Sequence, residues 1–258
     1  MATSTSMKKL SIAMGFATVI ALCTGSTAQA FGFTQFFGED LNNNIDENQR
    51  PPTPNATQAH LNFIANLMSY TTEDFENLSP GSGAPTTLNN GATISGGGNV
   101  RNAPFNGLNS TSGNSFWSYS YGDSNPDQDL SIKFSQAQNS FGFFATDMGD
   151  ANNGSQFSLI LSLLSGGTRT VAIPHTVGSP GGSVLYYGLI ADAPITGFAF
   201  QSDRTITLDG FGLDNVTVGD SKSASAPEPS TILGCLLAFG AFGAKRLQKS
   251  TRKAVKEV

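Results

Sequence analysis

The sequence predicts a mostly β protein, an antiparallel β-sandwich with one short helix near its N-terminus. Three observations support this fold class. From residue 71 onward, short alternating or apolar runs are separated by clusters of Gly, Asn, Ser and Pro, which is the spacing of an antiparallel sandwich. A single helical pattern precedes these runs. About 196 residues (31–226) lie between two targeting segments, and that length holds one domain with a core of its own.

Residues 1–30 are expected to be a cleavable signal peptide. Lys8 and Lys9 precede an apolar run over 10–22, and the small-residue exit Ala28-Gln29-Ala30 follows. This is the order of parts in a secretion signal, with cleavage before Phe31. The secretion machinery and a signal peptidase are therefore expected partners.

Residues 31–70 are expected to form an N-terminal loop and the helix. The segment 31–52 is rich in Asn, Gly and acidic residues, which indicates a loop or an edge ribbon. Thr53 can cap a helix whose first turn carries Pro54. Four apolar residues then recur near one helical face: Leu61, Ile64, Leu67 and Met68.

The predicted sandwich occupies residues 71–220, and residues 221–226 form a linker. The candidate strands are 72–78, 85–95, 115–122, 129–135, 140–146, 156–164, 168–174, 183–191, 195–202, 204–208 and 212–218. Two Gly-rich turns separate some of them, at 95–99 and 179–182. Neither turn leads from a strand into a helix, so neither is a phosphate-binding loop.

The last 32 residues, 227–258, have the layout of an envelope sorting signal. Pro227, Glu228 and Pro229 precede an apolar stretch over 231–244, and six basic residues follow it. Fourteen helical residues reach about 21 Å against a hydrocarbon core of roughly 30 Å, so the expected C-terminal transmembrane helix is short. The basic residues should stay in the cytoplasm. An ordinary C-terminal membrane anchor is the alternative.

This tail resembles the PEP-CTERM sorting signal, through the segment Pro227-Glu228-Pro229-Ser230-Thr231, the apolar stretch and the basic end. The resemblance implies that a membrane-embedded, exosortase-like protease recognises the motif and cleaves near it. The protein is then expected to be exported, transiently membrane-anchored, and finally located in the cell envelope, at the surface or outside the cell.

The central region has a resemblance of its own. The segments 35–42 (QFFGEDLN), 72–77 (TEDFEN), 176–184 (TVGSPGGSV) and 211–219 (FGLDNVTVG) are similar to a group of exported β-sandwich proteins that usually bear PEP-CTERM tails. The resemblance implies a jelly-roll-like fold, similar to carbohydrate-binding modules. It implies no established activity.

The exported part of the chain is acidic, with 6 Lys and Arg against 17 Asp and Glu over residues 31–226. Such a surface repels phosphate backbones, and no basic patch interleaved with aromatic residues is present, so nucleic acid is excluded as a partner. Cys23 and Cys235 both lie in the targeting ends. The central domain therefore has no disulfide, Cys-rich zinc site or Cys nucleophile, and two histidines are too few for a His-rich metal centre.

Structural calcium is the candidate cofactor. In jelly-roll modules of the carbohydrate-binding type, a Phe-Glu near the first strand and an Asp-Asn near the last lie side by side and hold a cation. The resemblance places these pairs at Phe75-Glu76 and Asp214-Asn215, with Asp74 adjacent. Carboxylate and carbonyl oxygens are the ligands that calcium requires. In the alternative, backbone amides at strand ends satisfy Glu76 and Asp214.

A second acidic cluster, Asp147, Asp150 and Asn152, lies in a Gly-rich segment and is expected to be a solvated turn.

Trp117, Tyr119 and Tyr121 alternate with smaller residues, so their rings should project from one face of a strand. That face could bind ligand as a platform on which sugar rings stack. The same alternation is typical of a strand that faces a hydrophobic core, with its serines outward, and this alternative is favoured.

The sequence contains no catalytic pattern. A serine-hydrolase triad would need His175, expected in a surface turn, and no Gly-x-Ser-x-Gly motif accompanies it. The spacing of the acidic residues singles out no pair for glycoside hydrolysis. We therefore expect a non-catalytic binding or structural protein associated with exopolysaccharide; a secreted glycan-active hydrolase is the alternative.

Overall fold

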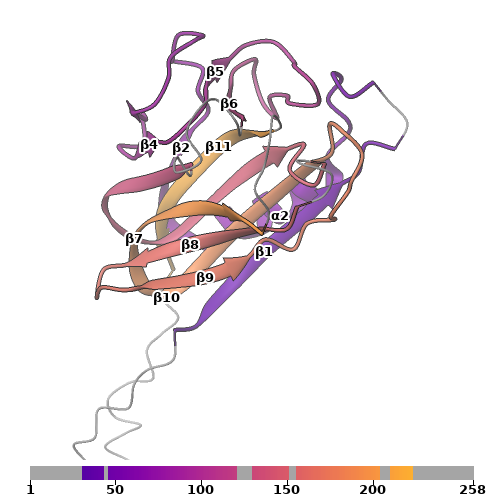
Figure 1. Ribbon diagram of the computed structural model, residues 1–258. Helices are drawn as coiled ribbons and strands as arrows, with labels where there is room; N and C mark the ends of the chain where they lie inside the picture. The colour runs from indigo at the N-terminus through magenta and orange to yellow at the C-terminus, as the bar shows by residue number, and fades with distance from the viewer. Residues whose placement is uncertain (1–30, 44–45, 121–129, 151–154, 204–209, 223–258) are drawn as a thin grey trace, which may run out of the picture.

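The computed structural model describes residues 31–43, 46–120, 130–150, 155–203 and 210–222 (Figure 1). The signal peptide, the motif Pro227-Glu228-Pro229 and the transmembrane segment 231–244 lie outside the described residues and stay predictions. Over the described ranges, no helix has the length and apolar character needed to span a membrane.

The described chain confirms a mostly β, antiparallel fold with one helix. The elements are β1 (Phe33–Asp40), α2 (Pro54–Ile64), β2 (Leu67–Glu73), β3 (Thr86–Thr87), β4 (Thr93–Ser95), β5 (Asn99–Arg101), β6 (Phe116–Ser120), β7 (Ser131–Thr146), β8 (Phe157–Leu163), β9 (Thr168–Ala172), β10 (Val184–Ser202) and β11 (Gly210–Ser221). The strands form a single sheet with the path β5-β6-β11-β7-β10-β8-β9, and β1, β2 and β4 join it at β10, β11 and β7.

The two longest strands, β7 and β10, divide this sheet into two layers (Figure 1). In the first layer, residues 184–190 of β10 pair with residues 140–146 of β7 and with β1. In the second layer, residues 195–202 of β10 pair with β8. The pairing of β10 with β7 shifts its register between Ile190 and Ile195. A register shift bends a strand, so each long strand passes from one layer to the other without a turn.

The larger core fills the space between the two layers. Its centre is a group of packed rings. The ring centroids of Phe141 in the first layer and Phe198 in the second are 4.3 Å apart with the rings stacked, and those of Phe143 and Phe200 are 5.2 Å apart in an edge-to-face arrangement. All four side chains are at most 2% exposed. Aromatic rings bury large apolar areas and stabilise each other at these spacings, so this group holds the layers together.

Helix α2 covers the outer face of the first layer. Ala56, Ala59 and Phe63 pack there against a smaller core that includes Phe144 and Tyr186. Neighbouring residues of a strand point to opposite faces, which is why Phe143 and Phe144 of β7 belong to different cores. The helix lies so close to β1 that a Cβ on Gly38 would meet the Asn55 carbonyl oxygen at 2.2 Å.

The predicted helix is confirmed, but the four apolar residues do not share one face of it. Leu61 and Met68 are 49% and 70% exposed, and Leu67 already belongs to β2. The predicted cap is also replaced: Thr53 occupies the N-cap position without a side-chain hydrogen bond. Asp40 of β1 accepts hydrogen bonds from the backbone N–H groups of Asn55 and Ala56 at 3.1 and 2.9 Å and satisfies the helix N-terminus instead.

The sequence pattern divided two strands that are continuous. The predicted strands 129–135 and 140–146 are both parts of β7, and 183–191 and 195–202 are both parts of β10. Pro194 stands between the two predicted segments of β10 and lies at the register shift, where the ladder does not need its missing N–H. The edge-ribbon reading of 31–52 is confirmed for β1, and the predicted strand 204–208 lies outside the described residues.

Candidate functional site

The predicted stacking platform is wrong for two of its three rings. Trp117 and Tyr119 are 0% and 2% exposed. The Trp117 ring lies 6.2 Å from that of Phe75, and the Tyr119 ring lies 5.3 Å from that of Phe211. These two residues are therefore part of the core between the layers, as the favoured alternative predicted, because β6 pairs with β11 inside the sheet. Tyr121 lies outside the described residues.

Glu76 and Asp214 bind the same loop. Glu76 Oε1 accepts hydrogen bonds from the backbone N–H groups of Asn114 and Ser115 at 2.7 and 2.6 Å. Asp214 Oδ2 accepts three, from the backbone N–H and the hydroxyl of Thr111 and from the N–H of Ser112, at 2.7 to 2.9 Å. The two carboxylates therefore hold the segment 111–115 against the sandwich.

Asp214 is buried at the point where β11 changes partner. Residues 210–213 of β11 pair with β6, whereas residues 216–221 pair with β2, and the register against β7 shifts between Asp214 and Thr217. The side chain is 1% exposed. Burial raises the pKa of Asp214 from 3.8 to about 6, although the hydrogen bonds from Ser112, Thr111 and Asn215 oppose this shift.

The carboxylates of the calcium hypothesis accept backbone N–H groups, as the amide alternative expected, and calcium itself stays a prediction. Val216 pairs with Glu73, which confirms that the chain near Glu76 and Asp214 comes together across β2 and β11. Asp74 Oδ1, however, accepts the backbone N–H of Glu76, and the other two carboxylates accept the N–H groups of the loop 111–115. Over the described residues, no three His, Cys, Asp or Glu side chains are placed to hold a metal.

Asp147 is not in a solvated turn, contrary to the prediction. It is 3% exposed, has a positive φ of 66° and accepts a hydrogen bond from the backbone N–H of Gly182 at 2.7 Å. Its neighbour Asp150 is exposed, and Asn152 lies outside the described residues. The buried carboxylate joins the end of β7 to the loop before β10.

His175 is a structural residue rather than a surface base. It is 6% exposed, and its Nε2 accepts the backbone N–H of Phe157 at 3.1 Å. Burial lowers the pKa of the imidazole, which keeps it neutral and able to accept that hydrogen bond. Because Nε2 is already engaged, His175 cannot serve as the general base that a serine hydrolase needs.

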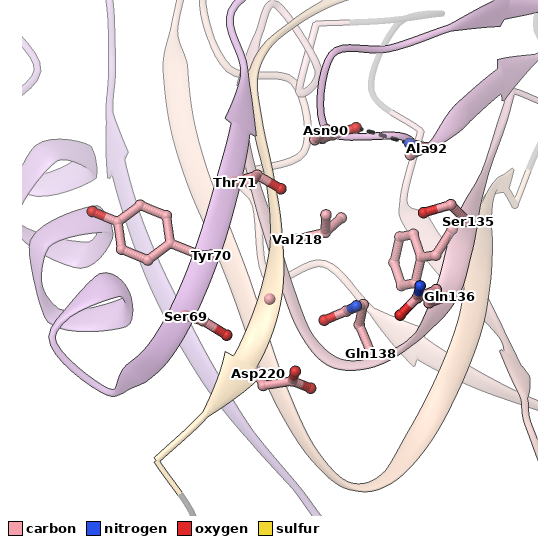
Figure 2. A pocket seen from close by; sticks show the side chains of 12 residues that line it. Ser69, Tyr70, Thr71, Asn90, Ala92, Ser135, Gln136, Gln138, Val218 and Asp220 are labelled. Carbon is pink, nitrogen blue, oxygen red and sulfur yellow. Dashed lines mark hydrogen bonds between the residues drawn. The ribbon is translucent and has the colours of Figure 1, made fainter.

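A groove that the sequence patterns did not indicate lies between β2, β11 and β7. Its volume is about 190 Å³. Figure 2 shows Ser69 and Thr71 of β2 and Asp220 of β11 on one side of Val218, and Ser135, Gln136 and Gln138 of β7 on the other, whereas the Tyr70 ring points away toward α2. We call this site the polar groove. The residues that line it are Ser69, Tyr70, Thr71, Asn90, Ala92, Phe134, Ser135, Gln136, Gln138, Val218, Gly219 and Asp220.

Most polar side chains of this groove have no partner in the described part of the molecule. Six of them take part in none of its hydrogen bonds: Ser69, Thr71, Ser135, Gln136, Gln138 and Asp220. Asn90 differs, since its amide donates to the Val216 carbonyl and accepts from the Ala92 N–H. Asn90 therefore shapes the groove, while the six unpaired side chains are available to a ligand.

The charge of the polar groove is limited to one carboxylate. Among the residues that the structure describes, Asp220 is the single acidic residue that lines it, and no Lys or Arg does so. The floor is apolar, since Phe134 and Val218 are 5% and 6% exposed. Hydroxyl and amide groups above an apolar floor suit a polar, uncharged ligand.

Comparison with known proteins gives distant structural matches. No protein-family model matches the chain, and no curated protein matches its sequence. The K2 cleaved adhesin domain of Lys-gingipain aligns with a TM-score of 0.38 and 14% identity, over 58% of this chain and 99% of that domain. A mutant of the family 29 carbohydrate-binding module CBM29-2 aligns with a TM-score of 0.34 and 16% identity, over 62% and 99%.

A third solved structure matches this chain at a similar distance. The CBM22-1 xylan-binding domain of Paenibacillus barcinonensis Xyn10C aligns with a TM-score of 0.38 and 12% identity, over 60% of this chain and 95% of that domain. All three alignments cover nearly the whole neighbour and about three fifths of this chain, and their TM-scores below 0.5 describe a distant likeness.

Proposed function

We propose that this protein is an exported, non-catalytic, glycan-binding β-sandwich of the cell envelope or extracellular matrix, which binds exopolysaccharide in the polar groove. One observation carries the proposal: six unpaired hydroxyl, amide and carboxylate side chains line a single groove. Sugars present alternating hydroxyl donors and acceptors, which glutamine amides and serine or threonine hydroxyls can match. The side chains project from strands, so the strand backbones hold them in place before a ligand binds.

The composition of the groove supports binding rather than hydrolysis. Glycoside hydrolases act with two carboxyl groups that flank the scissile bond. Asp220 is the one carboxylate among the residues that line the groove, and the buried His175 is engaged with Phe157 elsewhere. The groove therefore lacks a partner for Asp220 in acid and base catalysis.

Binding is tested with mature protein purified from the culture. We expect it to be retained in affinity gels that contain the exopolysaccharide of its own cells and to release no reducing sugar from it. Retention without hydrolysis supports the proposal. Release of reducing sugar would establish the hydrolase alternative, and a protein that neither binds nor cleaves would be an inert matrix component.

The proposed location depends on the two ends of the chain. The signal segment 1–30 and the sorting segment 227–258 imply processing by a signal peptidase and by an exosortase-like protease. Mass spectrometry of the secreted protein should find Phe31 as the first residue and a C-terminus near Pro227. An intact C-terminus at Val258 in the secreted fraction would contradict the sorting hypothesis.

A further inference from the structure

The size of the polar groove limits what can occupy it. Its volume of about 190 Å³ is below the roughly 300 Å³ at which pockets for drug-sized ligands begin. Ser69, Thr71, Ser135 and Gln136 are exposed, so the groove opens to solvent along both walls. A small unit of a longer chain can therefore enter from the side, while the rest of the chain stays outside.

The charge of the groove determines which polysaccharide chains can bind in it. Asp220 is the one acidic residue among the described residues that line it, and residues 31–226 carry 17 acidic against 6 basic residues. Within the described ranges, no lysine or arginine lines the groove to pair with a uronate or a sulfate group. An acidic sugar would bring its own negative charge close to the Asp220 carboxylate, and like charges at such distances repel.

The two walls offer complementary hydrogen-bonding groups. Asp220 supplies carboxylate oxygens, which accept from two neighbouring hydroxyls at once. Gln136 and Gln138 on the facing wall each supply an amide that donates and accepts. Val218 lies between these walls in Figure 2, and Phe134 also lines the groove, so the apolar floor can contact the C–H face of a sugar ring.

We propose that the polar groove binds one uncharged sugar unit within a neutral polysaccharide, with Asp220 and Gln138 as its main hydrogen-bonding residues, and that it rejects acidic polysaccharides. This inference rests on the proposed function and names the ligand class of the same site. It also assigns the specificity: the Asp220 carboxylate binds hydroxyls and excludes anions.

The experiment measures binding of the mature protein to neutral polysaccharides (xylan, mannan, dextran and β-glucan) and to acidic ones (alginate and polygalacturonate) by affinity gel electrophoresis. We expect retention by at least one neutral polysaccharide and no retention by either acidic one. Asp220→Ala and Gln138→Ala should each weaken binding about tenfold or more, since one well-formed hydrogen-bonding contact to a charged or amide group is of that order. Binding should be the same at low and high salt because the ligand carries no charge.

Met68→Ala is the matched control. Met68 lies on β2 next to Ser69, is 70% exposed and is not among the residues that line the groove, so its loss should leave binding unchanged. Asp220 and Gln138 are half-buried, and their side chains take part in no hydrogen bond within the described residues, so both variants should keep the wild-type melting temperature.

The possible outcomes separate this inference from the proposed function. Neutral binding that survives Asp220→Ala and Gln138→Ala would overturn the groove assignment, and retention by the acidic polysaccharides alone would overturn the ligand class; glycan binding would stand in both cases. If wild-type protein binds no polysaccharide in the series or from its own cells, the proposed function fails and this inference fails with it. A variant that unfolds is replaced by Asp220→Asn or Gln138→Glu, and unchanged neutral binding in either would also count against the groove.

Discussion

Replacing Asp214 by asparagine should remove a specific pH dependence from the stability of this protein. The carboxylate is buried, and it accepts hydrogen bonds from Thr111, Ser112 and Asn215. Burial raises its pKa from 3.8 to about 6 in the folded protein. The folded chain therefore binds this proton more readily than the unfolded chain does, and the free energy of unfolding falls as the pH rises from about 4 to about 6.

The size of the effect follows from the two pKa values. One pKa unit corresponds to about 1.4 kcal/mol, so the shift from 3.8 to about 6 corresponds to about 3 kcal/mol over the whole interval. About 2 kcal/mol of this is lost between pH 4.5 and pH 7. Asparagine does not titrate, so Asp214→Asn should show none of this loss. Groups that titrate equally in both proteins cancel in the comparison.

The assay is urea unfolding of wild-type and Asp214→Asn protein at several pH values between 4.5 and 7. We expect the difference between their free energies of unfolding to change by about 2 kcal/mol across this range, with the wild-type protein relatively more stable in acid. Glu76→Gln is the control, because Glu76 accepts hydrogen bonds from the same loop but is exposed. Parallel pH profiles for wild-type and Asp214→Asn protein would refute the reasoning.

Three further predictions concern the core, a histidine and the cofactor. Phe198→Ala should lower the free energy of unfolding by about 3–5 kcal/mol in urea, because this ring joins the two layers, whereas Met68→Ala, 70% exposed, should change it by less than about 0.5 kcal/mol. Burial lowers the pKa of His175 from 6.5, so the unfolded chain binds this proton first and stability should be lost as the pH falls below 6.5; His175→Gln should lessen that loss in thermal melts at pH 5 to 7. A calcium chelator should leave the melting temperature unchanged, because amides already hold Glu76 and Asp214; a fall would establish the calcium hypothesis.

The helix shows which structural features local sequence patterns can predict and which they cannot. Thr53 and Pro54 mark its start correctly, because cap position and first-turn preferences depend on neighbouring residues alone. Its buried face could not be predicted in the same way. The helix lies close against β1 at Gly38, so the small Ala56 and Ala59 pack inward, and larger residues such as Leu61 stay exposed.

The candidate site residues depend on tertiary contacts even more than the helix does. The alternation around Trp117 and Tyr119 is identical for an exposed platform and for a buried strand, and pairing of β6 with β11 decides between them. The polar groove has no local pattern at all. Ser69, Gln138 and Asp220 come from three strands far apart in the sequence and meet because β11 lies between β2 and β7.

The order of residues alone establishes an acidic central region without cysteine, and it predicts the antiparallel strands and the targeting ends, because composition, alternation and turn residues are local properties. Folding of the sheet into two layers settles what these properties leave open. Whether a ring is buried, and whether Asp214 or Asp220 finds a hydrogen-bond partner, depends on contacts between residues distant along the chain. The polar side chains of the groove form one site only because pairing of the strands places β11 between β2 and β7.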